Sequence, residues 1–94
     1  MKIYLAHRIK LAGRETFPCA SPEVAELVRQ LIAREYWQEW RERGDLDRPY
    51  EDFADPRAAA DFYFARLGEH GIEHFEVDQV ELLDEVKVKE LAAA

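Results

Sequence analysis

Residues 21–44 read SPEVAELVRQLIAREYWQEWRERG, and this stretch decides the fold. Ser21 followed by a proline is a strong helix start, because the serine oxygen accepts a hydrogen bond from an unpaired backbone N–H and proline has no N–H to leave unpaired. Gly44 is typical of the position just past a helix end. The sequence therefore predicts one long helix from Pro22 to about Arg43.

This long helix carries two apolar sets that point in different directions, given about 100° of rotation per residue. One set consists of Val24, Leu27, Val28 and Leu31, and the other, on nearly the opposite side, of Tyr36, Trp37 and Trp40. One flat core cannot cover both sets. Either the following loop folds back over the aromatic residues with Tyr50 and Phe53, or the aromatic residues form an exposed patch that binds a partner.

The residues before the long helix have the two-residue period of a strand. Residues 1–11 alternate apolar and polar side chains and predict a first strand, whose core-facing side carries Ile3, Leu5, His7 and Ile9. A turn at Gly13 allows a short second strand at residues 16–17.

The residues after the long helix begin with a loop at 45–55. Asp55 and the proline after it repeat the helix start signal, so a second helix is expected from Pro56 to about His70, ended by Gly71. From Ile72 onward the alternation predicts a strand with a bulge at residues 78–79, followed by a further strand at 86–88. The rival interpretation is a terminal helix that starts at Asp78.

These elements define one small α+β domain over residues 1–94: strand, long helix, helix, strand and a further strand, with two helices packed on one face of a thin sheet. Residues 92–94 resemble a cloning remnant. Pairing of the open sheet edges with a second copy predicts a homodimer.

The composition excludes several classes of function. Thirteen Lys and Arg against twenty Asp and Glu give a net charge of −7, which is the wrong sign for direct binding to nucleic acid. Cys19 is the only cysteine, so an intrachain disulfide is impossible and a cytoplasmic location is expected. Neither a leader nor a membrane segment is indicated in the sequence.

The acidic residues are concentrated in the second half of the chain, where residues 44–94 hold fourteen acidic and five basic side chains. Such a surface favours a partner protein with a basic surface. The candidate partner-binding residues are Tyr36, Trp37, Trp40, Glu69, Glu73, Glu76, Asp78 and Glu81.

The histidines suggest a second kind of site. Tyr4, His7, Tyr63 and His74 are the candidates to line a pocket between the sheet and the helices. His70 and His74 have helical spacing for a metal, but Gly71 interrupts it, so no metal and no cofactor are expected. No catalytic residue is assigned.

The sequence therefore favours a small acidic, non-catalytic protein-binding module, a regulator or inhibitor of a larger basic protein, nucleic-acid-handling proteins included. The alternative is a small enzyme or ligand-binding domain that uses the histidine- and tyrosine-lined pocket.

Overall fold

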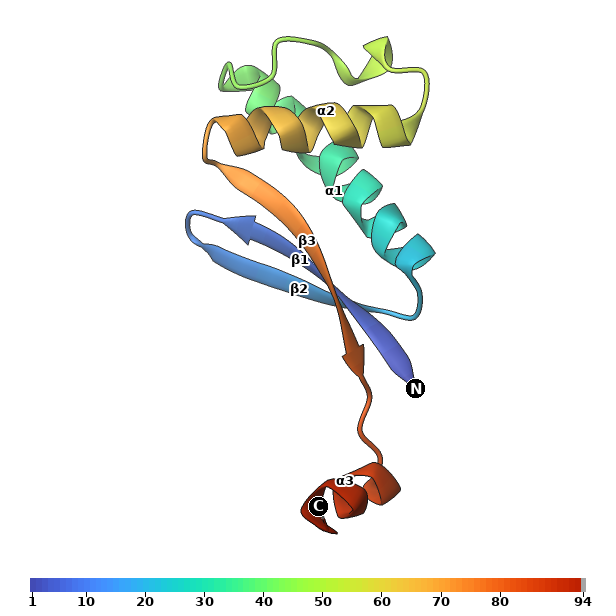
Figure 1. Ribbon diagram of the computed structural model, residues 1–94. Coiled ribbons are helices and arrows are strands. Elements are labelled where there is room, and N and C mark those ends of the chain that lie inside the picture. Colours follow the sequence, from blue (N-terminus) through green and yellow to red (C-terminus); the bar gives the residue numbers. More distant parts are fainter. Residues whose placement is uncertain (94) are drawn as a thin grey trace.

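The computed structural model describes residues 1–93, apart from the side chain of Lys87. It is a three-stranded sheet with helices on one side, which confirms the α+β class (Figure 1). In chain order the elements are β1 (Lys2–Lys10), β2 (Gly13–Cys19), α1 (Pro22–Glu42), a single 3₁₀ turn η1 (Tyr50–Asp52), α2 (Pro56–Glu69), β3 (Glu73–Glu81) and α3 (Glu85–Ala93).

The sheet has the order β2-β1-β3 and is antiparallel throughout, so β1 is the central strand. The second strand covers Gly13–Cys19 and is longer than the two residues expected. β3 pairs with β1 in an unbroken register in which Leu5 is opposite Asp78 and Tyr4 is opposite Gln79. The bulge predicted at residues 78–79 is therefore wrong.

Both long helices begin and end close to where the sequence predicts. The Ser21 oxygen accepts a hydrogen bond from the Val24 N–H at 3.2 Å, and the Asp55 carboxylate accepts one from the Ala58 N–H at 2.9 Å. Each helix is followed by a glycine in the left-handed region, where a side chain would be strained. These glycines are Gly44, with φ of 86°, and Gly71, with φ of 69°.

The C-terminal residues differ from both predictions. Residues 86–88 belong to α3 and not to a strand, and the terminal helix begins at Glu85 and not at Asp78. The strand period continues through Glu81 because β1 supplies a pairing partner along the whole of β3.

The aromatic face of α1 belongs to the core. Trp37 is 2% exposed, its ring centroid lies 5.5 Å from that of Tyr50 and 5.4 Å from that of Phe53, and its N–H donates to the Arg48 carbonyl at 2.8 Å. The loop after α1 thus folds back over the tryptophan, and the interpretation of Trp37 as an exposed anchor is wrong. Leu46, a loop residue that the sequence pattern did not single out, is also buried.

The first strand has the opposite orientation from the one predicted. Ala6 packs with Cys19 and Ala25 on the helix side of the sheet. Since alternate residues of a strand point to opposite faces, the set that includes His7 lies on the open side, away from α1 and α2. That set is Ile3, Leu5, His7 and Ile9.

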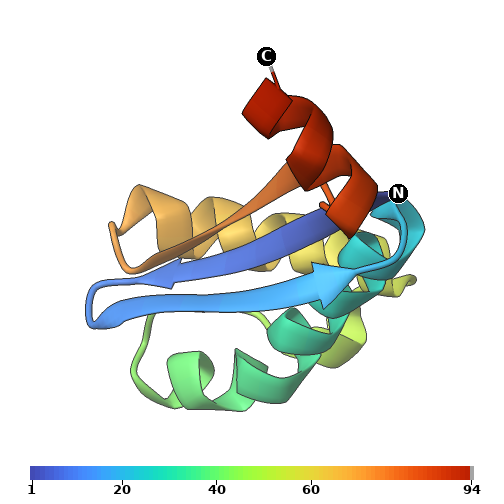
Figure 2. The same ribbon diagram turned by 90° about the horizontal axis from the view of Figure 1, so that it is seen from below.

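The two long helices lie on the same side of the three strands, whereas α3 stands apart beyond the end of β3 (Figures 1 and 2). The radius of gyration is 16.8 Å, compared with about 12 Å for a compact chain of this length. The radius of gyration is larger because the C-terminal segment projects from the rest of the molecule.

Substitutions on the two faces of α1 are expected to affect stability to very different extents. Trp37→Ala removes a buried aromatic side chain and is expected to lower the free energy of unfolding by about 3–5 kcal/mol. Leu31→Ala, at a position that is 54% exposed, is expected to change it by less than about 0.5 kcal/mol. Urea unfolding measures both, and equal effects would contradict this orientation of the helix.

A cluster of ion pairs joins α1 to α2, in addition to their apolar contact in the core. The Arg29 guanidinium donates two hydrogen bonds of 2.7 Å to Glu26 and a third of 2.7 Å to Asp61 on α2. The hydrogen bonds from Arg29 hold the pKa of Glu26 below its ordinary value of 4.5, and Gln30 and Arg57 lower this pKa further. The charged form of Glu26 therefore stabilises the folded state.

Glu26→Gln is expected to lower the free energy of unfolding at pH 7 by about 1 kcal/mol, because it weakens a bidentate, charge-assisted pair. The pKa of Glu26 is depressed on folding, so its contribution is complete above 4.5 and is lost as the pH falls through the folded-state pKa. The difference between wild type and variant, measured by urea unfolding from pH 7 to pH 2.5, should shrink toward acid. A constant difference would contradict the assignment.

Candidate functional site

The predicted partner-binding residues do not form one surface. Trp37 is buried, while Tyr36 and Trp40 are half-buried against the core. Glu73 is 2% exposed and points toward the helices, so its prediction as part of an acidic partner-binding surface is wrong. The candidates that remain exposed are Glu69, Glu76, Asp78 and Glu81.

The predicted pocket residues lie on two sides of the sheet. Tyr63 is fully buried on the helix side, and Tyr4 packs on the same side. His7 and His74 lie on the open side, because they alternate with Ala6 and Glu73. The structure does not bring these four side chains together, since the histidines and tyrosines are separated by the sheet itself.

A buried ion pair that the sequence pattern did not reveal lies between the sheet and the helices. Arg8 is 3% exposed and donates to both carboxylate oxygens of Glu73, from Nε at 2.7 Å and from Nη2 at 3.1 Å. Its Nη1 donates to Glu15 at 2.9 Å, and its guanidinium lies 3.8 Å from the ring centroid of Tyr36. The Tyr63 hydroxyl completes the network by donating to Glu73 at 2.9 Å.

Burial and charge act together on the groups of this network. Burial by itself lowers the pKa of Arg8, but the hydrogen bond and the negative charge of Glu73 outweigh it, and the net pKa is raised. Burial and the neighbouring Glu73 charge raise the pKa of Tyr63. Both groups therefore keep their protons at neutral pH, and neither is prepared to exchange one in a reaction.

The open side of the sheet holds a short chain of hydrogen bonds. Nδ1 of His7 lies 2.9 Å from the Thr16 hydroxyl, and Nε2 lies 2.8 Å from the Asp78 carboxylate. A hydroxyl, an imidazole and a carboxylate in this order can activate a nucleophile. Thr16 lies on β2, His7 on β1 and Asp78 on β3, so the chain of hydrogen bonds crosses all three strands. The arrangement therefore acts as a cross-strand link.

The outer face of α1 is the largest feature without a partner in the described chain. We use this name for Val24, Leu27, Leu31, Arg34 and Gln38, which succeed one another on the side of the helix away from the core. The three apolar members are 40%, 62% and 54% exposed. They belong to the apolar set of Val24, Leu27, Val28 and Leu31, and they are free because the aromatic set faces the core. Val28, the fourth member, packs against the core.

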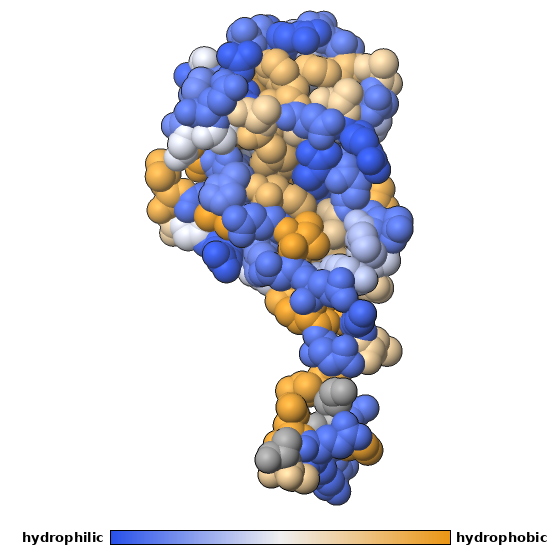
Figure 3. Space-filling model, viewed as in Figure 1, coloured by the Kyte–Doolittle hydropathy of each residue, from blue (hydrophilic) through white to orange (hydrophobic). Residues whose placement is uncertain are grey.

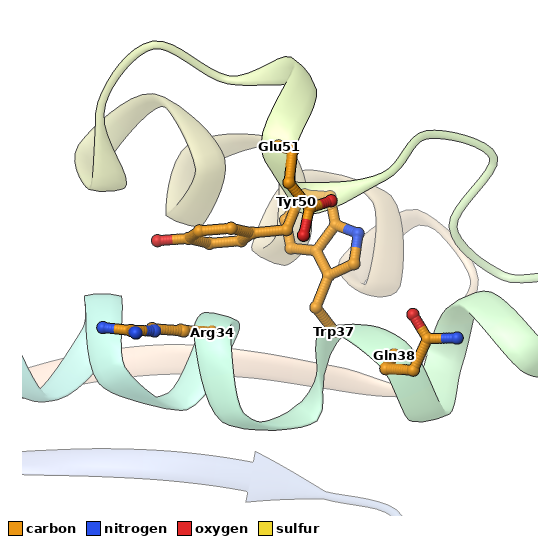
Figure 4. A pocket seen from close by; sticks show the side chains of 5 residues that line it. All are labelled: Arg34, Trp37, Gln38, Tyr50 and Glu51. Atoms are coloured by element: carbon orange, nitrogen blue, oxygen red, sulfur yellow. The ribbon is translucent and has the colours of Figure 1, made fainter.

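Grooves border the outer face of α1. The largest has a volume of about 490 Å³ and lies between α1, which supplies Arg34 and Gln38, and the η1 turn, which supplies Tyr50 and Glu51 (Figure 4). Figure 4 shows the Tyr50 ring above the Arg34 side chain. An adjoining groove of about 190 Å³ shares those two residues and extends to Leu27, Leu31 and Pro56. Together they make a trough with one polar and one apolar end.

The polar end of this trough has charged groups available. Among the described residues, neither Arg34 nor Glu51 makes an ion pair. Within residues 1–93, no group of three or more His, Cys, Asp or Glu side chains is placed to hold a metal ion. In the same residues, no helix combines the length and the apolar composition of a membrane-spanning segment.

Compared with protein-family models, curated proteins and solved structures, the chain matches none of them. The functional proposal therefore rests on the structure of this chain alone.

The Arg8–Glu73 network makes a prediction about stability. Glu73→Leu leaves Arg8 buried without its main partner and is expected to lower the free energy of unfolding by about 3–5 kcal/mol. The double variant Arg8→Met/Glu73→Leu removes both charges and is expected to be less destabilised than Glu73→Leu alone, by about 1 kcal/mol or more. Glu76→Leu, on the exposed side of the same strand, is the control, with a change under about 0.5 kcal/mol. Additive losses in the double variant would contradict the pairing.

Proposed function

We propose that this chain is a non-catalytic protein-binding module that acts as a small regulator or inhibitor of a larger basic protein. The observation that carries the proposal is the outer face of α1, an exposed apolar row bordered by grooves. Rows of this kind, with apolar side chains at helical spacing and polar residues around them, are typical of surfaces that bind another protein segment.

Charge supports a basic partner. The chain has a net charge of −7, and carboxylates without an ion pair among the described residues border the outer face of α1 at Glu23, Glu35 and Glu51. Long-range attraction of a basic protein would raise the rate of association, while burial of Leu27 and Leu31 would hold the complex together.

The organisation of the interior supports a binding role over a catalytic one. Arg8, Glu73 and Tyr63 satisfy one another and hold their protons, and His7 is fixed between two strands. The trough over α1 instead combines an apolar end at Leu27 and Leu31 with a polar end at Arg34 and Glu51. That lining suits a peptide segment.

Photocrosslinking in the source cells tests this proposal. A photoreactive amino acid replaces Leu27, and the same amino acid replaces Leu11, which is 86% exposed at the far end of the β1–β2 hairpin. The expected result is a covalent adduct with a different protein from position 27 only. Adding Leu31→Asp to the chain should reduce the yield of that adduct at least about tenfold, because a buried charge opposes the contact.

Equal adducts from positions 11 and 27, or an adduct from position 27 that survives Leu31→Asp unchanged, would show that the outer face of α1 is not the binding surface.

A further inference from the structure

The C-terminal segment, residues 82–93, is a second place where apolar side chains are exposed, and we call it the arm. It leaves the end of β3 and stands apart from the helices and the sheet (Figures 1 and 2). The space-filling view shows hydrophobic surface on the arm, joined to the body by a narrow neck (Figure 3). Its exposed apolar side chains, each between 48% and 65% exposed, are Leu82, Leu83, Val86, Val88 and Leu91.

An arm of this kind needs a surface to pack against. α3 has nine residues, and isolated helices shorter than about 12–15 residues are marginal in water. An ion pair among its described side chains, between Lys89 and Glu85 at 3.1 Å, is exposed and adds little. A helix of this length therefore needs packing against another surface to be stable.

The outer face of α1 fits the arm in length and in charge. α3 is about 13 Å long, and the row from Val24 to Arg34 spans about 15 Å. With the two helices parallel and Val86 opposite Leu27, Glu90 lies about 6 Å further along, opposite Leu31 and one turn before Arg34, whose long side chain reaches back toward it. Among the described residues neither Glu90 nor Arg34 has an ion-pair partner, so each supplies the charge that the other lacks.

We infer that two copies of this chain form a symmetric dimer in which the arm of each lies along the outer face of α1 of the other. The inference rests on the proposed function, because it names the second copy as an occupant of the same face. Each copy gives one arm and one face, so a two-fold axis closes the assembly with two identical contacts. A protein partner must then displace the arm, and dimerisation and partner binding exclude each other.

The buried area is sufficient for such a dimer. Six apolar side chains, each between 40% and 65% exposed, can meet in each contact: Val24, Leu27 and Leu31 of the face and Leu82, Leu83 and Val86 of the arm. Covering them in both contacts removes roughly 1,000 Å² of apolar surface, which reaches the lower bound for stable interfaces before any polar atoms are counted. The sheet edges are poorer candidates, because β3 has the sequence EHFEVDQVE and self-pairing would bring carboxylates together.

Sedimentation velocity over a range of concentrations tests the inference with the full chain. Wild type is expected to be a dimer at micromolar concentration. The face variant Leu27→Asp/Leu31→Asp and the arm variant Leu83→Asp/Val86→Asp should each weaken the dimer about 100-fold or more. Leu11→Asp is the control and should dimerise as wild type does. All four positions are exposed, so circular dichroism should show an unchanged fold.

Mixing the two variants gives the decisive result. The face variant keeps an intact arm and the arm variant keeps an intact face, so an equimolar mixture can form one complete contact and should form heterodimers. Direct pairing of two α1 faces, or of two arms, predicts that one of the variants alone still dimerises and that mixing adds nothing. Either result, or a wild type that is monomeric at every concentration, overturns the arm exchange.

The same variants separate the inference from the proposed function. A monomeric wild type that still forms the adduct at position 27 overturns the arm exchange and leaves the protein-binding proposal standing. A dimer that behaves as described, in a chain whose position 27 crosslinks only to a second copy, supports the arm exchange and overturns the regulatory role.

Discussion

The pair of hydrogen bonds between Arg8 and Glu73 joins the central strand to an edge strand inside the molecule, where water cannot replace either partner. Tyr36 on α1 lies against the guanidinium and Tyr63 on α2 donates to the carboxylate, so this contact fixes four elements at once. A buried charge pair tolerates little displacement, because separation leaves two unpaired charges in a medium that solvates them poorly. The orientation of β1 follows from it, and the contact of Tyr36 with the guanidinium is one of those that set the rotation of α1.

That constraint explains which features were predictable from the sequence. The caps at Ser21 and Asp55 and the glycines after the two helices are local signals, since each depends on a few neighbouring residues, and they placed α1 and α2 within two residues. The orientation of β1 is a different problem. Ile3, Leu5 and Ile9 are more apolar than Tyr4, Ala6 and Arg8, so their pattern indicates the wrong face. Only the carboxylate of Glu73, sixty-five positions from Arg8, makes the charged face the inner one.

The same reasoning applies to α1 and to the candidate site. The two apolar faces of α1 cannot both lie in one core, so the sequence pattern indicated that one of them needed a further partner. It could not show which one, because the answer depends on the loop that brings Tyr50 and Phe53 onto Trp37. Charge patterning failed for Glu73 for a related reason, since a run of carboxylates does not reveal that one of them faces an arginine. Glu69, Glu76, Asp78 and Glu81 are exposed, and of these Glu76 and Asp78 lie on the open face of the sheet.

The interior and the surface of this small domain are therefore linked. Because Tyr36, Trp37 and Trp40 turn the aromatic face of α1 toward the core, the row of Val24, Leu27 and Leu31 lies outside the core. Exposed apolar groups with no role in the fold add a risk of non-specific association. In this chain the arm carries a second set of exposed apolar side chains. Both faces are satisfied if the arm of a second copy covers the row, because the contact hides apolar surface on both sides and pairs Glu90 with Arg34. A fold that uses a charged pair to organise its centre thus leaves apolar surface on the outer face of α1, where we propose that a partner binds.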